Sequence, residues 1–213
     1  MSDYLTEEEQ VARIKRWWAE NGKYVSVAIV LGIAGVFANN WYESYTEDRN
    51  IAASDLYERF LNASSVERSE VYDQLAGSAS GSGYHFLALM HLAKTAVIES
   101  DYEQARNHLT EAVEKAPSQV LADLSRLRLA KVLMEVEEIE NAIEVLRDIK
   151  STGFSSAASE LRGDIHLASG EEGLANEAYI SALKASGTNA ARPVLQMKVV
   201  DTTKVLDGQV IAD

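Results

Sequence analysis

Residues 161–182 read LRGDIHLASGEEGLANEAYISA and contain the clearest fold signal in this chain. Apolar and small residues recur every three or four positions on both sides of Gly170, which is the pattern of two amphipathic helices. Glycine readily adopts the left-handed conformation that ends many helices, so Gly170 marks the turn between them. The small residues Gly163 and Ala175 allow two helices to approach closely. This stretch therefore predicts a pair of packed helices.

Two further copies of the pair precede this one, beginning near Tyr84. Alanines occupy equivalent positions in the second helix of each copy, and they are Ala105, Ala142 and Ala175. Their separations bracket the 34-residue period of the tetratricopeptide repeat, in which small residues stand where paired helices cross. Three stacked copies over residues 84–213, closed by a capping helix over 193–206, predict an all-α solenoid. Unrelated helical hairpins in a bundle are the alternative.

The first helix of each pair carries a second apolar stripe beside the one that packs against its partner. In the first two copies its residues, with two lysines among them, are Leu87, Met90, Lys94, Val97, Leu127, Lys131 and Met134. Solenoids of this kind bind polypeptides on the surface formed by the first helices, so we expect these residues to line a groove for a partner peptide. The alternative is that helices within residues 51–75 cover the stripe.

Far upstream, residues 24–41 read YVSVAIVLGIAGVFANNW and contain no charged side chain. A helix of this length is roughly 27 Å long, close to the hydrocarbon thickness of a bilayer. Aromatic residues cluster near both ends, as they do at membrane–water interfaces: Trp17, Trp18, Tyr24, Trp41, Tyr42 and Tyr45. We therefore expect a single transmembrane helix over residues 24–42. A signal peptide cleaved after Ala38 and a buried helix of a soluble protein are the alternatives.

The basic residues before this segment all lie close to it, and they are Arg13, Lys15, Arg16 and Lys23. Acidic residues dominate just after it, so the positive-inside rule places residues 1–23 in the cytoplasm and the later residues across the membrane. Within the tail, Thr6 and Glu9 have the spacing of a capping box. They would begin a short amphipathic helix that ends at Gly22 and lies on membrane lipid. A simple N-terminal extension of the spanning helix is the alternative.

Residues 43–83 connect the membrane segment to the repeats. Their apolar spacing predicts two amphipathic helices, over residues 51–60 and 66–75. The run GSASGSG over residues 77–83 predicts a loop after the second of them.

The formal net charge of −13 lies mostly downstream of Tyr42, where 16 basic residues stand against 28 acidic ones. Phosphate backbones repel so acidic a domain, which argues against a nucleic-acid partner. The chain has no cysteine, and its histidines, His85, His91, His108 and His166, show no metal-ligand spacing. No phosphate-binding loop or catalytic motif occurs. We therefore expect no enzyme activity, cofactor, metal or small-molecule substrate, and a function in binding other proteins.

The residues IKRWWAENGK, 14–23, and the apolar helix after them resemble the YfgM-type ancillary subunit of the bacterial Sec translocon. So do Ile149-Lys150, Gly153-Phe154, residues 161–164 and residues 195–198, in the same order along the chain. The resemblance implies an inner-membrane protein whose periplasmic tetratricopeptide-like domain associates with Sec translocon subunits. It also implies a partnership with a membrane-anchored parvulin-like periplasmic chaperone, to which exported client proteins are passed.

Two further functions are open to this chain at this point. The resemblance also implies a cytoplasmic function in restraining a stress-response regulator, for which only the short tail before Tyr24 is available. The same repeats serve as scaffolds in other complexes, so an envelope adaptor in cell division or outer-membrane assembly is the alternative function.

Overall fold

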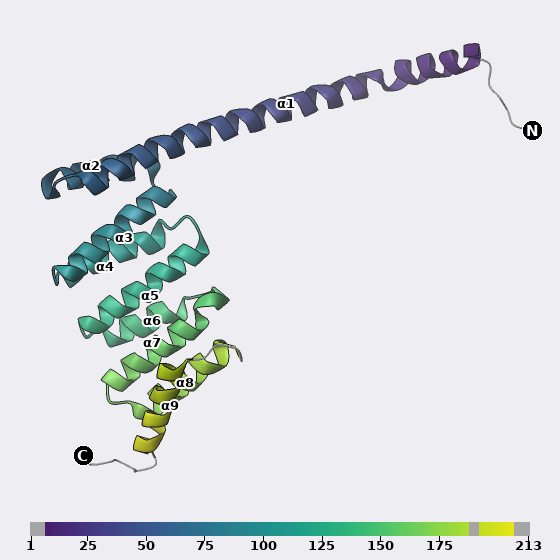
Figure 1. The fold of residues 1–213 in the computed structure, drawn as a ribbon. Helices are drawn as coiled ribbons and strands as arrows, with labels where there is room; N and C mark the ends of the chain where they lie inside the picture. Colours follow the sequence, from purple (N-terminus) through teal and green to yellow (C-terminus); the bar gives the residue numbers. More distant parts are fainter. Residues whose placement is uncertain (1–6, 188–191, 207–213) are drawn as a thin grey trace, which may run out of the picture. The chain divides into compact units, whose positions relative to one another are not determined.

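A computed structural model of the protein describes residues 7–187 and 192–206. Thr6 of the expected capping box and the side chain of Tyr45 lie outside the described part. Within these ranges the chain is helical with no strand, which confirms the all-α class (Figure 1). The helices are α1 (Glu7–Asn62), α2 (Ser65–Ala79), α3 (Gly83–Ile98), α4 (Tyr102–Glu114), α5 (Gln119–Glu135), α6 (Ile139–Arg147), the short 3-10 helix η1 (Thr152–Phe154), α7 (Ser155–Ala168), α8 (Glu172–Ala185) and α9 (Pro193–Leu206).

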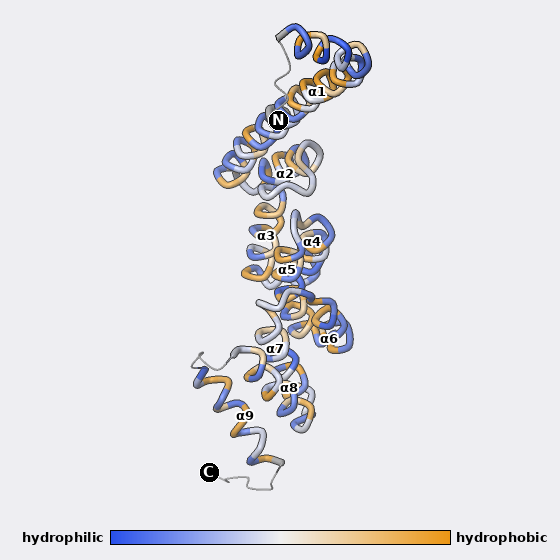
Figure 2. Tube along the Cα trace, turned by 90° about the vertical axis from the view of Figure 1, so that its right-hand side faces the viewer, coloured by the Kyte–Doolittle hydropathy of each residue, from blue (hydrophilic) through white to orange (hydrophobic). Residues whose placement is uncertain are grey.

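The chain divides into two compact units, Met1–Ala52 and Ala53–Asp213. In the first unit the described structure is α1 alone. The uncharged residues 24–41 fall inside this helix, where nearly all their side chains are exposed. Figure 2 colours part of α1 as hydrophobic. Among the described residues, α1 is the one helix long and apolar enough to cross a membrane.

Gly22 does not end a helix, so that expectation was wrong. The chain contains no proline between residues 7 and 62, and the residues on both sides of Gly22 favour helix, so α1 continues through it. The missing side chain instead makes room for the indole ring of Trp18, one turn earlier. A Cβ atom at Gly22 would stand 3.2 Å from that ring.

The helix expected over residues 51–60 is the last part of α1 rather than a separate element. From Ala53 onward it belongs to the second unit, where Phe60 packs with Leu75 of α2 and Ala88 of α3. The Arg68 guanidinium donates hydrogen bonds to the Phe60 and Ala63 carbonyl oxygens, at 3.3 and 2.9 Å. These bonds satisfy carbonyl groups that the end of α1 leaves without helical partners.

The expected loop over residues 77–83 is shorter than its composition predicted. Helix α2 begins at a capping box formed by Ser64 and Glu67 and continues to Ala79, so Gly77 and Ser78 are helical. The Ser78 hydroxyl donates to the Gln74 carbonyl oxygen at 2.7 Å, a bond that a serine inside a helix can form. Only residues 80–82 make the turn, with Gly81 at a φ of +75°.

Helices α3 to α8 form the three expected pairs, and α9 packs on the last of them (Figure 1). The alanines at the crossings, Ala105, Ala142 and Ala175, are all fully buried. At the third crossing Gly163 lies directly under the Tyr179 ring, and a Cβ atom there would come within 2.4 Å of it. Small residues thus set how closely each pair approaches, as the repeat pattern predicted.

The turn inside each pair has one hydrogen-bonding pattern. The amides of Asp101, Glu138 and Glu171 donate to the carbonyl oxygens of Ala96, Leu133 and His166, at 2.9, 2.9 and 2.8 Å. This is the bond that closes a helix through a residue in the left-handed conformation. That residue is Ser100, Glu137 and Gly170 in the three copies. The three pairs thus share one turn geometry, as copies of one unit are expected to do.

Candidate functional site: a groove between the first two repeats

A groove of about 690 Å³ lies between α3 and α5, beside the first half of α4. The groove is lined by Met90, Ala93, Lys94, Val97, Ile98, Tyr102, Leu109, Arg128, Lys131, Val132 and Glu135. It forms because α3 and α5 are the first helices of consecutive pairs and α4 packs against both.

The floor of the groove is apolar and continuous with the core. Ala93, Leu109 and Val132 are buried in the cluster that runs through α3 to α7. Val97 and Ile98 stand higher on the wall, with 38% and 72% of their surface exposed. An apolar partner side chain that covered this wall would gain about 25 cal/mol for each Å² removed from water.

Three cations stand on the rim, Lys94 of α3 and Arg128 and Lys131 of α5. None of them forms an ion pair or a side-chain hydrogen bond with a described residue, and Lys94 and Lys131 are exposed. Glu135 is the single acidic residue among the lining residues. Some cations elsewhere in this unit are paired, as in the 2.7 Å contact between the Arg106 guanidinium and the Glu138 carboxylate.

The structure brings four of the seven predicted groove residues together, and they are Met90, Lys94, Val97 and Lys131. Leu87 is exposed but outside this groove, while Leu127 and Met134 are half-buried against the core. Met90 was expected to be an exposed anchor, and this was wrong. It is only 7% exposed and forms part of the floor, with its sulfur 3.6 Å from the Ser125 hydroxyl.

Residues 51–75 do not cover this groove in the described structure. Phe60 and Tyr57 reach a different part of α3, where their rings lie 5.5 Å from His91 and 6.0 Å from Tyr84. The alternative that the chain's own helices fill the groove is therefore not what the second unit shows.

The sequence patterns did not identify the other residues that line the groove. Arg128 and Glu135 lie three and four positions from Lys131, so they share its helix face, and that spacing could have found them. Tyr102 and Leu109 lie on α4, and only the packing of α4 beside α3 and α5 brings them to the groove.

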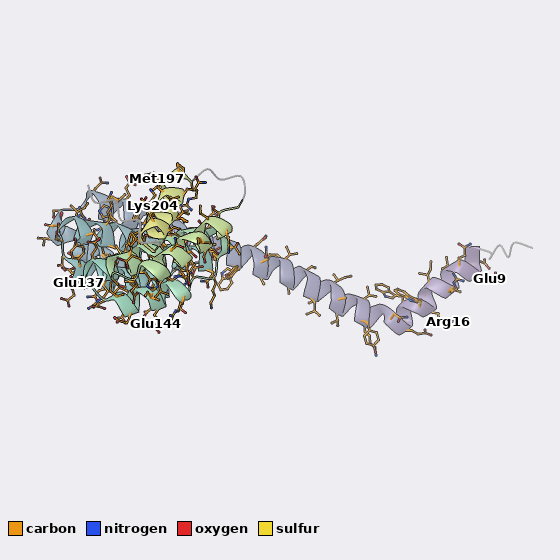
Figure 3. The ribbon with its side chains drawn as sticks, turned by 90° about the horizontal axis from the view of Figure 1, so that it is seen from below. Glu9, Arg16, Glu137, Glu144, Met197 and Lys204 are labelled. Atoms are coloured by element: carbon orange, nitrogen blue, oxygen red, sulfur yellow. The ribbon has the colours of Figure 1, made fainter. Side chains whose placement is uncertain are left out.

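The predicted topology residues Arg13, Lys15, Arg16 and Lys23 are all exposed on α1. The Lys23 ammonium lies 4.9 Å from the centre of the Tyr24 ring. Figure 3 shows the side chains of this helix around Arg16.

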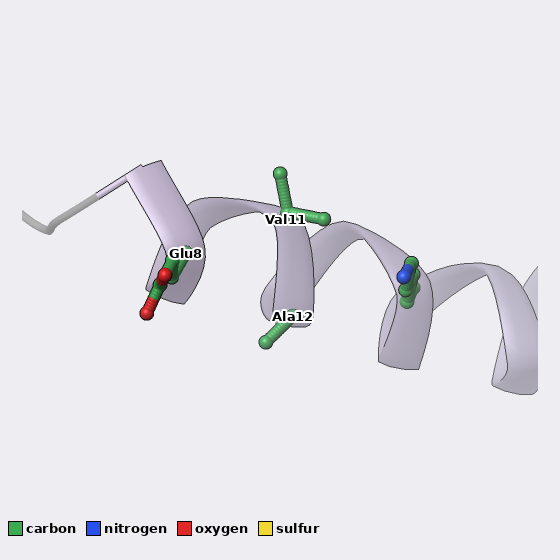
Figure 4. A pocket seen from close by; sticks show the side chains of 4 residues that line it. Glu8, Val11 and Ala12 are labelled. Carbon is green, nitrogen blue, oxygen red and sulfur yellow. The ribbon is translucent and has the colours of Figure 1, made fainter.

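A shallow hollow on α1 is bounded by Glu8, Val11, Ala12 and Lys15 (Figure 4). One face of a single helix forms it, so it cannot enclose a ligand.

Histidines and acids of the described residues form no group of three or more that would hold a metal ion. His85 is fully buried, its Nε2 atom 3.4 Å from the Tyr72 hydroxyl and 3.7 Å from the Glu111 carboxylate. Burial lowers the pKa of His85, against the smaller opposing effect of Glu111. The Tyr72 hydroxyl donates to Glu111 at 2.9 Å, so this cluster ties α2, α3 and α4 together.

Stacked helix pairs with buried alanine crossings, following a long apolar helix, define a helical-repeat protein of the tetratricopeptide class. A family model for a tetratricopeptide repeat-like domain matches residues 15–204. The chain belongs to this family, which includes proteins named ancillary SecYEG translocon subunit.

Three relatives with that name are similar over most of their length. The one from Aggregatibacter actinomycetemcomitans is 32% identical over 190 residues, covering 88% of this chain and 93% of the relative. Those from Haemophilus influenzae and Escherichia coli are 28% and 27% identical, each covering 93% of this chain and 98% of the relative. The family model spans the apolar segment as well as the repeats.

Proposed function

We propose that this chain is a membrane-anchored accessory subunit of the Sec translocon whose repeat unit binds other proteins. The observation that carries the proposal is α1, a single helix that contains the uncharged residues 24–41 and continues into the start of the repeat unit. The names of the relatives support the partner, because these proteins are similar to this chain over 88–93% of its length.

The orientation follows from charge. Arg13, Lys15, Arg16 and Lys23 are exposed just before the apolar segment, while Glu47 and Asp48 follow it. Basic residues near a span are retained on the cytoplasmic side, so the N-terminus is cytoplasmic and the repeat unit periplasmic. Val11, Ile14 and Trp18 are exposed on one face of α1, where they contact lipid at the cytoplasmic surface.

In the periplasm the repeat unit works by binding. Its partners are translocon subunits, a membrane-anchored parvulin-like chaperone, and exported proteins that pass from the first to the second. The groove between α3 and α5 is the surface we assign to peptide segments of these partners, because its apolar wall at Val97 and Ile98 is exposed and its cations form no ion pair with a described residue.

Co-purification from mild detergent tests this proposal. A tagged full-length chain is expected to recover SecYEG and a periplasmic chaperone. In the control variant Arg13, Lys15, Arg16 and Lys23 are replaced by glutamate, which weakens the orientation signal and is expected to reduce recovery of the chaperone. Recovery of division or outer-membrane assembly proteins in place of SecYEG would favour the envelope-adaptor function instead.

A further inference from the structure

The groove between α3 and α5 combines an apolar floor with a basic rim. Its floor, with Ala93, Leu109 and Val132, is apolar. Its rim carries Lys94, Arg128 and Lys131 against Glu135 alone, a local net charge of +2, although the chain downstream of Tyr42 has 28 acidic and 16 basic residues. The rim of the groove is therefore positively charged within a unit that is acidic as a whole.

Lys94, Arg128 and Lys131 form no ion pair with a described residue, although some other cations of this unit do. Arg126, one turn from the groove on the same helix, is paired with Asp123 at 2.9 Å, and Lys198 contacts both Glu160 and Asp164. Carboxylates are abundant in this unit, yet none of the described ones pairs with Lys94, Arg128 or Lys131. The three cations remain available to a partner's carboxylates.

The size of the groove limits what it can take. Its volume of about 690 Å³ lies within the range of roughly 300–1,000 Å³ that encloses a drug-sized molecule. A short peptide segment fits such a volume. Nucleic acid would also meet the cations, but the surrounding negative charge repels a continuous polyanion, and the apolar floor offers its phosphates nothing.

We infer that the groove binds a short peptide segment of a partner protein that carries carboxylates beside apolar side chains. The apolar side chains cover Val97, Ile98 and the floor, while the carboxylates meet Lys94, Arg128 and Lys131. This inference rests on the proposed function, since it gives the sequence chemistry of the segment that the repeat unit recognises.

Peptide binding to the purified full-length chain in detergent tests the inference. The probes are three fluorescent eight-residue peptides: alternating leucine and glutamate, alternating leucine and lysine, and alternating serine and glutamate. Fluorescence anisotropy is expected to show binding of the first at least tenfold tighter than either of the others. Raising the salt from 50 to 500 mM is expected to weaken it, because exposed charges are screened.

Variants locate the binding. Lys94→Glu with Lys131→Glu is expected to weaken binding of the leucine–glutamate peptide at least tenfold. The matched control is Arg147→Glu with Lys184→Glu, which makes the same charge change at exposed positions on α6 and α8 and is expected to leave the affinity unchanged. Val97→Ser with Ile98→Ser is expected to weaken binding too, whereas Val120→Ser with Leu174→Ser, at other exposed apolar positions, is not.

Several outcomes would overturn the inference. Equal loss in the two charge variants would show that total charge alone attracts the peptide. Equal affinity for all three peptides would show that the groove does not select this chemistry. A wild-type dimer that the Lys94→Glu, Lys131→Glu variant converts to monomer, without peptide binding, would assign the groove to a second copy of the chain.

The two proposals fail separately. A chain that co-purifies with SecYEG but does not discriminate the peptides would retain the proposed function and lose the groove's assignment. A chain that discriminates the peptides as expected but recovers no SecYEG would retain the assignment of the groove and lose the proposed function.

Discussion

At the scale of single residues, the three repeat turns share a left-handed residue but differ in its type. Ser100 and Glu137 both have φ near +60°, whereas the third copy has glycine at the equivalent position, with Gly170 at +72°. A residue with a Cβ atom is strained in the left-handed region by roughly 1–2 kcal/mol, and glycine is not. The first two turns therefore store strain that the third avoids.

Replacing Glu137 with glycine should stabilise the repeat unit by about 0.5–1 kcal/mol, because relief of the strain exceeds the backbone entropy that glycine loses on folding. Chemical denaturation of the full-length chain in detergent measures the change. The control is Glu144→Gly inside α6, labelled with Glu137 in Figure 3, which should destabilise the unit by about 1 kcal/mol. A loss of stability in both variants would contradict the assigned turn conformation.

Burial of histidines makes stability depend on pH. Burial lowers the pKa of His85, His91 and His108 below the ordinary value of 6.5. The unfolded chain therefore binds more protons than the folded one as the pH falls below 6.5, and the free energy of unfolding should fall until the lowered pKa values are reached. For His85 the nearby charges are Glu111, which opposes the shift, and Lys115, which adds to it.

His85→Asn keeps an acceptor for the Gly81 amide but cannot be protonated in this range. Denaturation at pH 7.5, 6.5 and 5.5 should show a shallower dependence on pH in this variant than in the natural chain, even if its stability at pH 7.5 is lower. Parallel curves would show that His85 is not the buried neutral group that the structure describes.

At the scale of elements, one buried carboxylate joins two repeats. Asp123 of α5 accepts hydrogen bonds from the Lys150 and Ser151 amides at 3.1 and 2.8 Å, and from Gln119 and Arg126. Its burial alone would raise the pKa, but these hydrogen bonds lower it to about 2. The side chain thereby fixes the segment between α6 and η1 against α5.

Asp123→Asn should destabilise the unit by about 2–3 kcal/mol. The amide NH₂ group cannot accept from the two backbone amides, or from Gln119 and Arg126, so buried donors lose a partner whichever way it turns. Thermal unfolding of the full-length chain measures the effect, with exposed Asp148→Asn as the matched control, expected within 0.5 kcal/mol of the natural chain. An equally small effect at Asp123 would contradict the described hydrogen bonds.

The success of sequence reasoning also differs from element to element. The buried alanines and Pro193 at the start of α9 were predictable, because periodicity and helix-start signals act locally. The helix end predicted at Gly22 and the loop predicted from Gly77 were wrong, since glycine permits a helix to end without requiring it. Met90 and Tyr102 could not be placed, because a stripe on one helix does not reveal how deeply a neighbouring helix buries it.

At the scale of the whole molecule, the proposal joins three features of the sequence: the uncharged residues 24–41, the basic residues before them, and the acidic repeat unit after them. A helix needs an uncharged stretch such as residues 24–41 to cross a bilayer. The basic residues before it predict the orientation, because such residues stay on the cytoplasmic side. The family model covers residues 15–204, and two relatives named as SecYEG subunits are similar over 88% and 93% of this chain. The central claim is that α1 holds the repeat unit on the periplasmic side of the inner membrane.

Protease accessibility in spheroplasts tests that claim most directly, with tags at both ends of the full-length chain. Protease added outside should digest the C-terminal tag and the repeat unit, and leave a membrane-bound N-terminal fragment that carries its tag. Both tags should be digested once the membrane is dissolved with detergent. The orientation would be contradicted if the C-terminal tag survived in intact spheroplasts and disappeared only in detergent. The apolar segment would be a cleaved signal peptide if a soluble form beginning near Asn39 were released before protease is added.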